Sequence, residues 1–154
     1  FVSAMFLGDV DAMNEYMNRV ALQTFSYFDT GKRAFGAEPE RFYHGFVLGL
    51  LVDLQERYYL RSNRESGFGR YDVMLEPKDP KDVAVILEFK VRNKRRETSL
   101  EETAEAALKQ IQERKYDEEL KQKGIDDDKI REYGFAFEGK TVLIIDSLER
   151  KNKT

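Results

Sequence analysis

The stretch Val83-Ala-Val-Ile-Leu-Glu-Phe-Lys-Val91 is the strongest strand signal in this sequence, because it is rich in β-branched residues. It is apolar on both faces until its end, which is typical of a strand covered on both sides. An alternating segment, residues 70–76, precedes it, and a loop with two prolines, residues 77–82, lies between the two. The sequence therefore predicts a hairpin of two antiparallel strands.

Helical and strand patterns surround this hairpin on both sides. Pro39 suits the first turn of a helix, and Ser99 with Glu102 forms a capping box before another. The helix that begins at Pro39 is apolar over much of its circumference, so we expect it to be buried. The patterns predict helices over 10–25, 39–55 and 99–122, strands over 58–61, 133–137 and 141–145, and a turn over 62–69. This order indicates an α/β (α+β) fold in which helices flank a mixed sheet.

Size and composition limit the classes of protein to consider. The chain has 154 residues, the size of one domain, and it lacks a starting Met, so we expect a fragment of a longer protein. Its net charge of −3 argues against a protein that coats nucleic acid generally. The absence of cysteine excludes disulfides and thiolate metal sites and fits a cytoplasmic location. No apolar run approaches the roughly 20 residues that span a bilayer, so no membrane partner is expected.

The positive charge is concentrated just after the central strand. Five cations fall within seven residues, and more arginines lie in the segment before the hairpin. Such a run is suited to contacts with a phosphate backbone, although a solvated charged surface is the alternative. The cations at the end of the strand and after it are Lys90, Arg92, Lys94, Arg95 and Arg96, and those in the segment before this stretch include Arg64 and Arg70.

Two carboxylates of the hairpin are expected to face each other. If the loop centres near residue 80, antiparallel partners sum to about 160, and Asp72 lies opposite Glu88. Opposed carboxylates are destabilising unless a positive charge lies between them. Lys90 shares the face of Glu88, but a divalent cation such as Mg²⁺ would neutralise the pair better.

This arrangement suggests hydrolysis of a phosphodiester. A metal held by Asp72 and Glu88 would activate a water, and Lys90 would hold that water and contact the phosphate. The alternative is a surface hairpin whose acids pair with Lys90 and nearby arginines. A register slip of one residue would place Asp72 on the other face of the sheet.

Four blocks of sequence, in order along the chain, carry a resemblance to a known family. The sequence resembles the PD-(D/E)XK nuclease superfamily, and in particular a bacterial branch in which this domain follows an AAA-ATPase-like domain. The resemblance implies a restriction-endonuclease-like fold with the core order α-β-β-β-α-β, plus an extra N-terminal helix and a C-terminal strand. The blocks are residues 40–50, residues 62–72, Glu88-Phe89-Lys90, and residues 133–140.

The resemblance also assigns roles to the residues of the hairpin. It implies that Asp72 and Glu88 are ligands of Mg²⁺ or Mn²⁺, with the carbonyl of Phe89 as a third ligand, and that Lys90 is the catalytic lysine. Tyr71 stands where the superfamily's motif has a proline, a position that is commonly variable.

Further residues fit supporting roles in the superfamily. Glu40 would add to the metal shell, although an acid at a helix N-terminus is favourable in itself. Gln110 would orient the site from the long helix. Gln112, which with Tyr116 fits a Gln-x-x-x-Tyr pattern, competes for that role, and both glutamines also fit ordinary helix positions.

Phosphate contacts are expected from residues around these motifs. His44 lies one turn after Glu40 on the same helical face, although a lone helical histidine is more often a packed residue. Arg64 and Arg70 flank the glycine turn, where guanidinium groups could hold a phosphate.

Together these features predict a metal-dependent deoxyribonuclease, a phosphodiesterase acting on DNA. We expect an N-terminal segment over 1–38, a nuclease core over 39–147 and a polar tail over 148–154. The alternative is a non-catalytic nucleic-acid-binding or regulatory domain of an AAA-ATPase-like protein. The sequence leaves open RNA as a substrate, the strandedness of the substrate and a homodimer.

Overall fold

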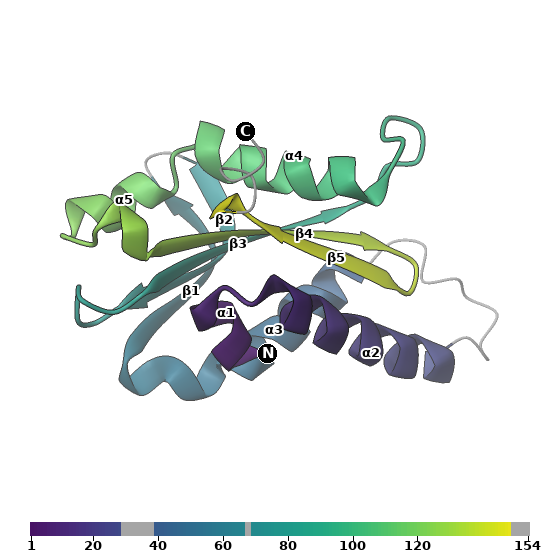
Figure 1. Ribbon diagram of the computed structural model, residues 1–154, viewed down its shortest axis with the longest axis horizontal. Helices are drawn as coiled ribbons and strands as arrows, with labels where there is room; N and C mark the ends of the chain where they lie inside the picture. The colour runs from purple at the N-terminus through teal and green to yellow at the C-terminus, as the bar shows by residue number, and fades with distance from the viewer. Residues whose placement is uncertain (29–38, 67–68, 149–154) are drawn as a thin grey trace.

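A five-stranded mixed sheet forms the middle layer of the molecule, with helices on both faces (Figure 1). The computed structural model describes residues 1–28, 39–66 and 69–148, without the side chains of residues 25–28, 39–40, 63–66 and 69–71. Its elements are α1 (Val2–Leu7), α2 (Val10–Phe28), α3 (Pro39–Leu51), the 3₁₀ helix η1 (Val52–Glu56), β1 (Tyr58–Ser66), β2 (Gly69–Pro77), β3 (Ala84–Val91), α4 (Leu100–Glu113), α5 (Asp117–Gln122), the 3₁₀ helix η2 (Asp127–Lys129), β4 (Ile130–Glu138) and β5 (Thr141–Asp146).

The strands lie in the order β1-β2-β3-β4-β5. All neighbours are antiparallel except β3 and β4, which run parallel because α4 carries the chain across the sheet between them. In the hairpin, Val73 pairs with Leu87 and Leu75 with Val85, so partner numbers sum to 160. The expected register is confirmed over these pairs, and by the same sum the next position along β2, Asp72, would lie opposite Glu88.

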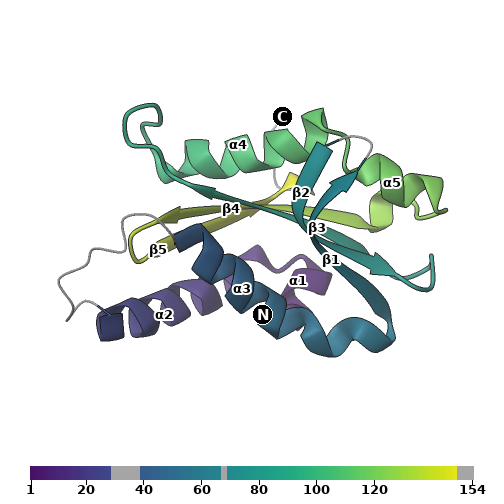
Figure 2. The ribbon, with the colours of Figure 1, turned by 180° about the vertical axis from the view of Figure 1, so that it is seen from behind.

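Each face of the sheet carries its own hydrophobic core. Helices α1, α2 and α3 cover one face, and α4 and α5 cover the other (Figures 1 and 2). Successive residues of β3 alternate between the two cores, with Leu87 against the N-terminal helices and Ile86 against α4. All residues from Ala84 to Phe89 are buried, so the prediction of a strand covered on both sides is confirmed.

The helix expected over 99–122 is interrupted, and this corrects the sequence-based prediction. The amide of Tyr116 donates to the carbonyl of Ile111, and the amide of Lys115 to that of Gln112. Lys115 has a φ of 51°, so these bonds form a Schellman motif with a lysine in the position that glycine usually takes. Tyr116 and Ile111 are both buried in the core on this face of the sheet, and the motif marks the point where α4 ends and the chain turns into α5.

Three further features differ from those expected. Residues expected to form a turn over 62–69 are mostly strand, because β1 pairs with β2 as far as the Ser66–Gly69 pair. Two helices, not one, precede α3. Helix α3 itself is buried on one side only, since Gly45 and Gly49 lie on its exposed side. None of the helices in the described residues is long and apolar enough to cross a membrane.

Candidate active site

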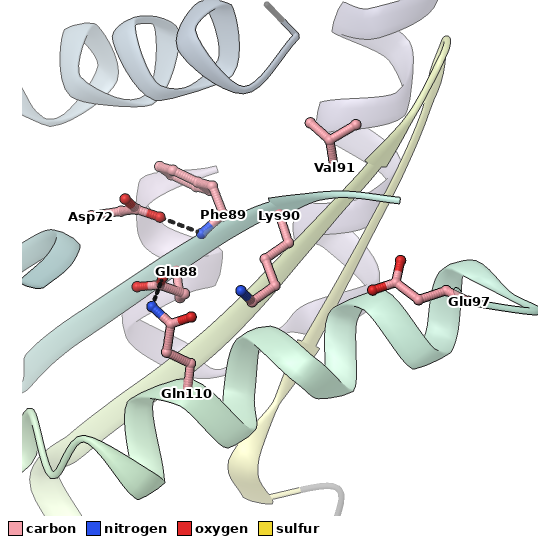
Figure 3. Close-up of a pocket in the computed structure, with 7 residues that line it drawn as sticks. All are labelled: Asp72, Glu88, Phe89, Lys90, Val91, Glu97 and Gln110. Carbon is pink, nitrogen blue, oxygen red and sulfur yellow. Dashed lines mark hydrogen bonds between the residues drawn. The ribbon is translucent and has the colours of Figure 1, made fainter. Parts of the chain in front are cut away.

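A polar pocket of about 370 Å³ lies where β2 and β3 meet α4 (Figure 3). Residues of both strands and of α4 line it, so it depends on the packing of the helix against the sheet. The lining residues are Asp72, Glu88, Phe89, Lys90, Val91, Glu97 and Gln110. Four of the residues expected to be catalytic therefore surround one cavity.

The two carboxylates reach the pocket from neighbouring strands. Asp72 shares its face of β2 with Met74, and Glu88 shares its face of β3 with Ile86, both of which pack in the α4 core. The Oδ2 atom of Asp72 accepts a hydrogen bond of 2.7 Å from the amide of Phe89, which fixes this carboxylate across the hairpin. Glu88 is only 4% exposed, so its charge is held in a largely desolvated position.

Gln110 connects α4 to the carboxylate of Glu88. Its side-chain amide donates a hydrogen bond to the Oε1 atom of Glu88 (Figure 3). A side-chain hydrogen bond also joins Gln110 and Tyr116. Burial raises the pKa of that tyrosine, and this bond opposes the shift. Gln112 is exposed and lines a separate recess with Lys115. Of the two glutamines considered, Gln110 is the one that reaches the pocket.

Gly134 allows α4 to approach the strand that carries Glu88. It pairs with Glu88 across β3 and β4. A Cβ atom at this position would collide with the carbonyl oxygen of Ala104 and would lie 3.1 Å from the Leu108 Cγ atom. Gln110 follows Leu108 by two residues, so the bare backbone of Gly134 sets the distance over which Gln110 reaches Glu88. In the sequence, Gly134 stands out only as part of the block of residues 133–140, and no role for it could be predicted.

Lys90 and Glu97 complete the lining on the side of the β3–α4 connection. Figure 3 shows the amine of Lys90 reaching into the pocket from β3, and the carboxylate of Glu97 facing the same space. The Oε2 atom of Glu97 accepts hydrogen bonds from the hydroxyl of Thr103 at 2.6 Å and from the amide of Asn93 at 2.8 Å. Sequence reasoning missed Glu97, because its place depends on the path of a connection that has no periodic pattern.

His44 lies on the other side of the sheet from the pocket carboxylates. Its Nε2 atom is 2.8 Å from the Ser62 hydroxyl and 3.2 Å from the carbonyl oxygen of Asp72, and its ring packs against Phe89. The histidine therefore joins α3 to the backbone of β1 and β2 behind the pocket. Its contact with a phosphate stays a prediction.

The basic run divides into a structural arginine and exposed cations. Arg92 forms an ion pair of 2.6 Å with Glu138 and donates to the carbonyl of Thr98 at 2.9 Å, so it anchors the β3–α4 connection. Lys94 lies 3.4 Å from the same glutamate but is largely exposed. Arg95 and Arg96 are exposed.

Three expected site residues cannot be placed. The side chains of Glu40, Arg64 and Arg70 lie outside the described residues. Their roles in the metal shell and in phosphate binding stay predictions.

The donor set of the pocket fits a hard divalent cation. Among the residues that the structure describes, no group of three or more histidine, aspartate or glutamate side chains could hold a metal ion. The pocket instead offers two facing carboxylates, and Mg²⁺ is commonly bound by one or two carboxylates while water and phosphate oxygens complete its shell. Asp72 and Glu88 thus fit Mg²⁺ or Mn²⁺.

Comparison with known proteins gives one positive result. A family model described as the PD-(D/E)XK nuclease superfamily matches residues 38–147, a range that includes Asp72, Glu88, Lys90 and Gln110. No curated protein and no solved structure matches significantly. The match gives no support for the AAA-ATPase-associated branch. With the hairpin, the facing carboxylates and the family match in agreement, the chain belongs to the PD-(D/E)XK nuclease superfamily.

Proposed function

We propose that this chain is a metal-dependent nuclease that hydrolyses DNA phosphodiester bonds at the pocket of Asp72, Glu88 and Lys90. The observation that carries the proposal is the meeting of two carboxylates from neighbouring strands with a lysine and a glutamine in one polar cavity. Membership of the superfamily supports the same class of reaction.

Asp72 and Glu88 would hold Mg²⁺ or Mn²⁺, with the carbonyl of Phe89 as a further oxygen ligand. When bound, such an ion lowers the pKa of a water molecule and offsets negative charge on a phosphate. Gln110 would restrict rotation of the Glu88 carboxylate through its hydrogen bond. Partners of this kind orient metal ligands and tune their affinity.

Lys90 would act on the phosphate and the attacking water. Its ammonium group has three N–H donors and no acceptor, so it would bind a phosphate oxygen and orient the water. During hydrolysis the water gives up one proton as its oxygen bonds to phosphorus, the bond from phosphorus to one ester oxygen breaks, and that oxygen takes up a proton. Stabilisation by Lys90 of the negative charge that develops on the phosphate oxygens is the kind of electrostatic effect that often contributes most to catalysis.

The surface beside the pocket favours binding to the sugar-phosphate backbone. Lys94, Arg95 and Arg96 are exposed on the connection that follows Lys90. Contacts from such cations position a nucleic acid without reading its bases, and their strength falls with added salt. We therefore propose DNA as the partner, recognised by strand structure and not by base sequence.

A cleavage assay tests this proposal. The protein is incubated with supercoiled plasmid, linear duplex or single-stranded DNA in Mg²⁺, Mn²⁺ or EDTA, with matched RNA as a comparison. Glu88→Gln and Lys90→Ala should abolish metal-dependent cutting while leaving the circular dichroism spectrum unchanged. Lys109→Ala, which removes an exposed lysine of α4, should cut as the wild type does. Cutting that survives in Glu88→Gln and Lys90→Ala, or its absence with every metal and substrate, would overturn the proposal.

The exposed cations also favour a second candidate, a nucleic-acid-binding domain without turnover. It differs in its expected result: Asp72→Asn would bind DNA as tightly as the wild type, and neither protein would cut. The resemblance of the sequence blocks supports a further proposal, that the full-length protein carries an AAA-ATPase-like domain. Sequencing the complete gene would test it.

A further inference from the structure

Two asparagines of α2 lie against the outer edge of β5. Asn14 donates to the carbonyl of Ile144 at 2.8 Å and accepts from its amide at 2.7 Å. Asn18 does the same with Val142, at 2.7 Å and 2.9 Å. Each carboxamide therefore satisfies both backbone groups of one strand residue, as a neighbouring strand would.

The spacing of the two asparagines matches the repeat of the strand edge. Residues four apart on a helix are separated by about 6 Å along its axis. Alternate residues of a strand, whose backbone groups point the same way, are separated by about 6.8 Å. A helix running along β5 can therefore present one carboxamide to each outward-facing residue in turn.

We infer that Asn14 and Asn18 form an edge cap that blocks a strand-pairing surface on β5, and that the partner fitting this surface is β5 of a second copy of this chain. The proposal does not depend on nuclease activity. Asn14 and Asn18 lie outside the family-matched range, 38–147, whereas β5 lies inside it, so these contacts extend the structural unit toward the N-terminus.

The sequence of β5 explains why its edge needs a cap. The strand reads Thr141-Val-Leu-Ile-Ile-Asp146, with β-branched residues, no proline and no charge before its last position. Exposed edges of this composition pair readily with other strands, and natural proteins cover or charge them. Two copies of one strand can pair antiparallel about a two-fold axis, because the same surface then serves both partners.

The rest of the N-terminal segment is fixed to the sheet by similar bonds. The hydroxyl of Tyr133 donates to the carbonyl of Met5 at 2.6 Å, and the Nε atom of Arg131 donates to that of Phe6 at 2.9 Å. Met13 and Met17, which alternate with the two asparagines along α2, are fully buried. The apolar contacts hold α2 in place, and the asparagines supply the polar match to the strand edge.

The test compares two double variants of the whole chain. Asn14→Ala/Asn18→Ala removes the edge cap, and Glu15→Ala/Arg19→Ala changes two residues with the same spacing on the same helix without altering net charge. Light scattering after size-exclusion chromatography, over a range of concentrations, gives the mass of each. Without the carboxamide bonds only the apolar contacts oppose the lifting of α2 from β5, and each lifting exposes the strand edge. We therefore expect the first variant to shift toward twice the wild-type mass as concentration rises, and the second to follow the wild type.

Hydrogen exchange provides the second measurement. In dilute samples of the asparagine variant, the amides of Val142 and Ile144 should exchange about fivefold faster or more, as expected when a hydrogen bond of about 1 kcal/mol is lost. If the double variant does not fold, hydrogen exchange of the Val142 amide in the single variant Asn18→Ala provides the same test. Unchanged mass at all concentrations, equal mass shifts in both double variants, or unchanged exchange would overturn the inference.

Discussion

The side-chain amide of Gln110 donates a hydrogen bond to the Oε1 atom of Glu88, which joins helix α4 to strand β3 inside the pocket. The bond crosses between two layers of the fold, so it forms only when the helix packs on the sheet. The approach of α4 at Gly134 and the turn that buries Tyr116 both maintain it. The geometry of the carboxylate site therefore depends on the packing of α4.

The first prediction concerns this hydrogen bond. Gln110→Ala should lower metal-dependent cleavage by roughly 10–100-fold, because the partner that orients Glu88 is removed. Gln112→Ala, which changes an exposed residue on the same helix, should be neutral. Initial rates measured over a range of Mn²⁺ concentrations check both. Equal losses in the two variants would mean that the effect comes from the helix and not from the pocket.

The second prediction concerns metal binding, measured through thermal stability and not through cleavage. In EDTA, Asp72→Asn should be at least as stable as the wild type, since it removes repulsion between two facing carboxylates. Added Mn²⁺ should raise the Tm of the wild type, because an ion that binds only the folded state stabilises it. The variant should show little change. A similar rise in Tm for both proteins would place the metal elsewhere, and calorimetric unfolding with and without Mn²⁺ measures this.

The third prediction concerns Gly134. Gly134→Ala should destabilise the fold by about 1–3 kcal/mol, because the new methyl group collides with the backbone of α4. It should also reduce cleavage by loosening the contact between Gln110 and Glu88. Gly49→Ala, on the exposed side of α3 with open space around it, should stabilise the fold by about 0.5–1 kcal/mol. Urea unfolding of both variants checks the opposite signs.

The fourth prediction concerns stability in acid. The hydrogen bond from Arg92 holds the pKa of Glu138 below its ordinary value of 4.5. A lowered pKa in the folded state means that the carboxylate stabilises the fold above pH 4.5, and that this contribution is lost as the pH falls through the lowered value. Glu138→Gln should therefore be less stable than the wild type at pH 7, and the difference should shrink toward pH 3.

Urea unfolding at several pH values measures this difference. Glu105→Gln, which neutralises an exposed acid on α4, serves as the control and should show no comparable dependence. A constant difference between wild type and Glu138→Gln from pH 7 to pH 3 would contradict the prediction.

Much of the hairpin could be predicted because its signals are local. The β-branched run to Val91 and the two prolines of the loop fix the strands and their turn, and period-two alternation then brings Asp72 opposite Glu88. The pairing register follows from the position of the loop centre near residue 80. Because both faces of β3 are buried, a shift of this register by one residue would move its side chains to the wrong faces. Asp72, Glu88 and Lys90, the strand positions that the sequence indicated, all line the pocket.

The end of α4 could not be predicted, because local helix propensity continues past it. Nothing at Lys115 suggests a left-handed residue, and the helix ends in a Schellman motif that buries Tyr116 in the same core as Ile111. This turn also brings Tyr116 within hydrogen-bond reach of Gln110. The sequence alone could not distinguish Gln110 from Gln112 as the residue that reaches the pocket. Arg92 was likewise expected at the phosphate backbone, but its ion pair depends on Glu138, 46 residues further along the chain.

The sequence by itself determined the strands, their alternation and the residue types that the chemistry of the pocket requires, since these follow from spacing and side-chain character along a short stretch. The tertiary structure alone decided which of those residues meet. Glu97 reaches the pocket, His44 lies behind it, and Asn14 pairs with Ile144, 130 residues away. Such contacts depend on how the helices pack against the sheet. A local sequence pattern does not specify which residue from another layer a side chain will meet.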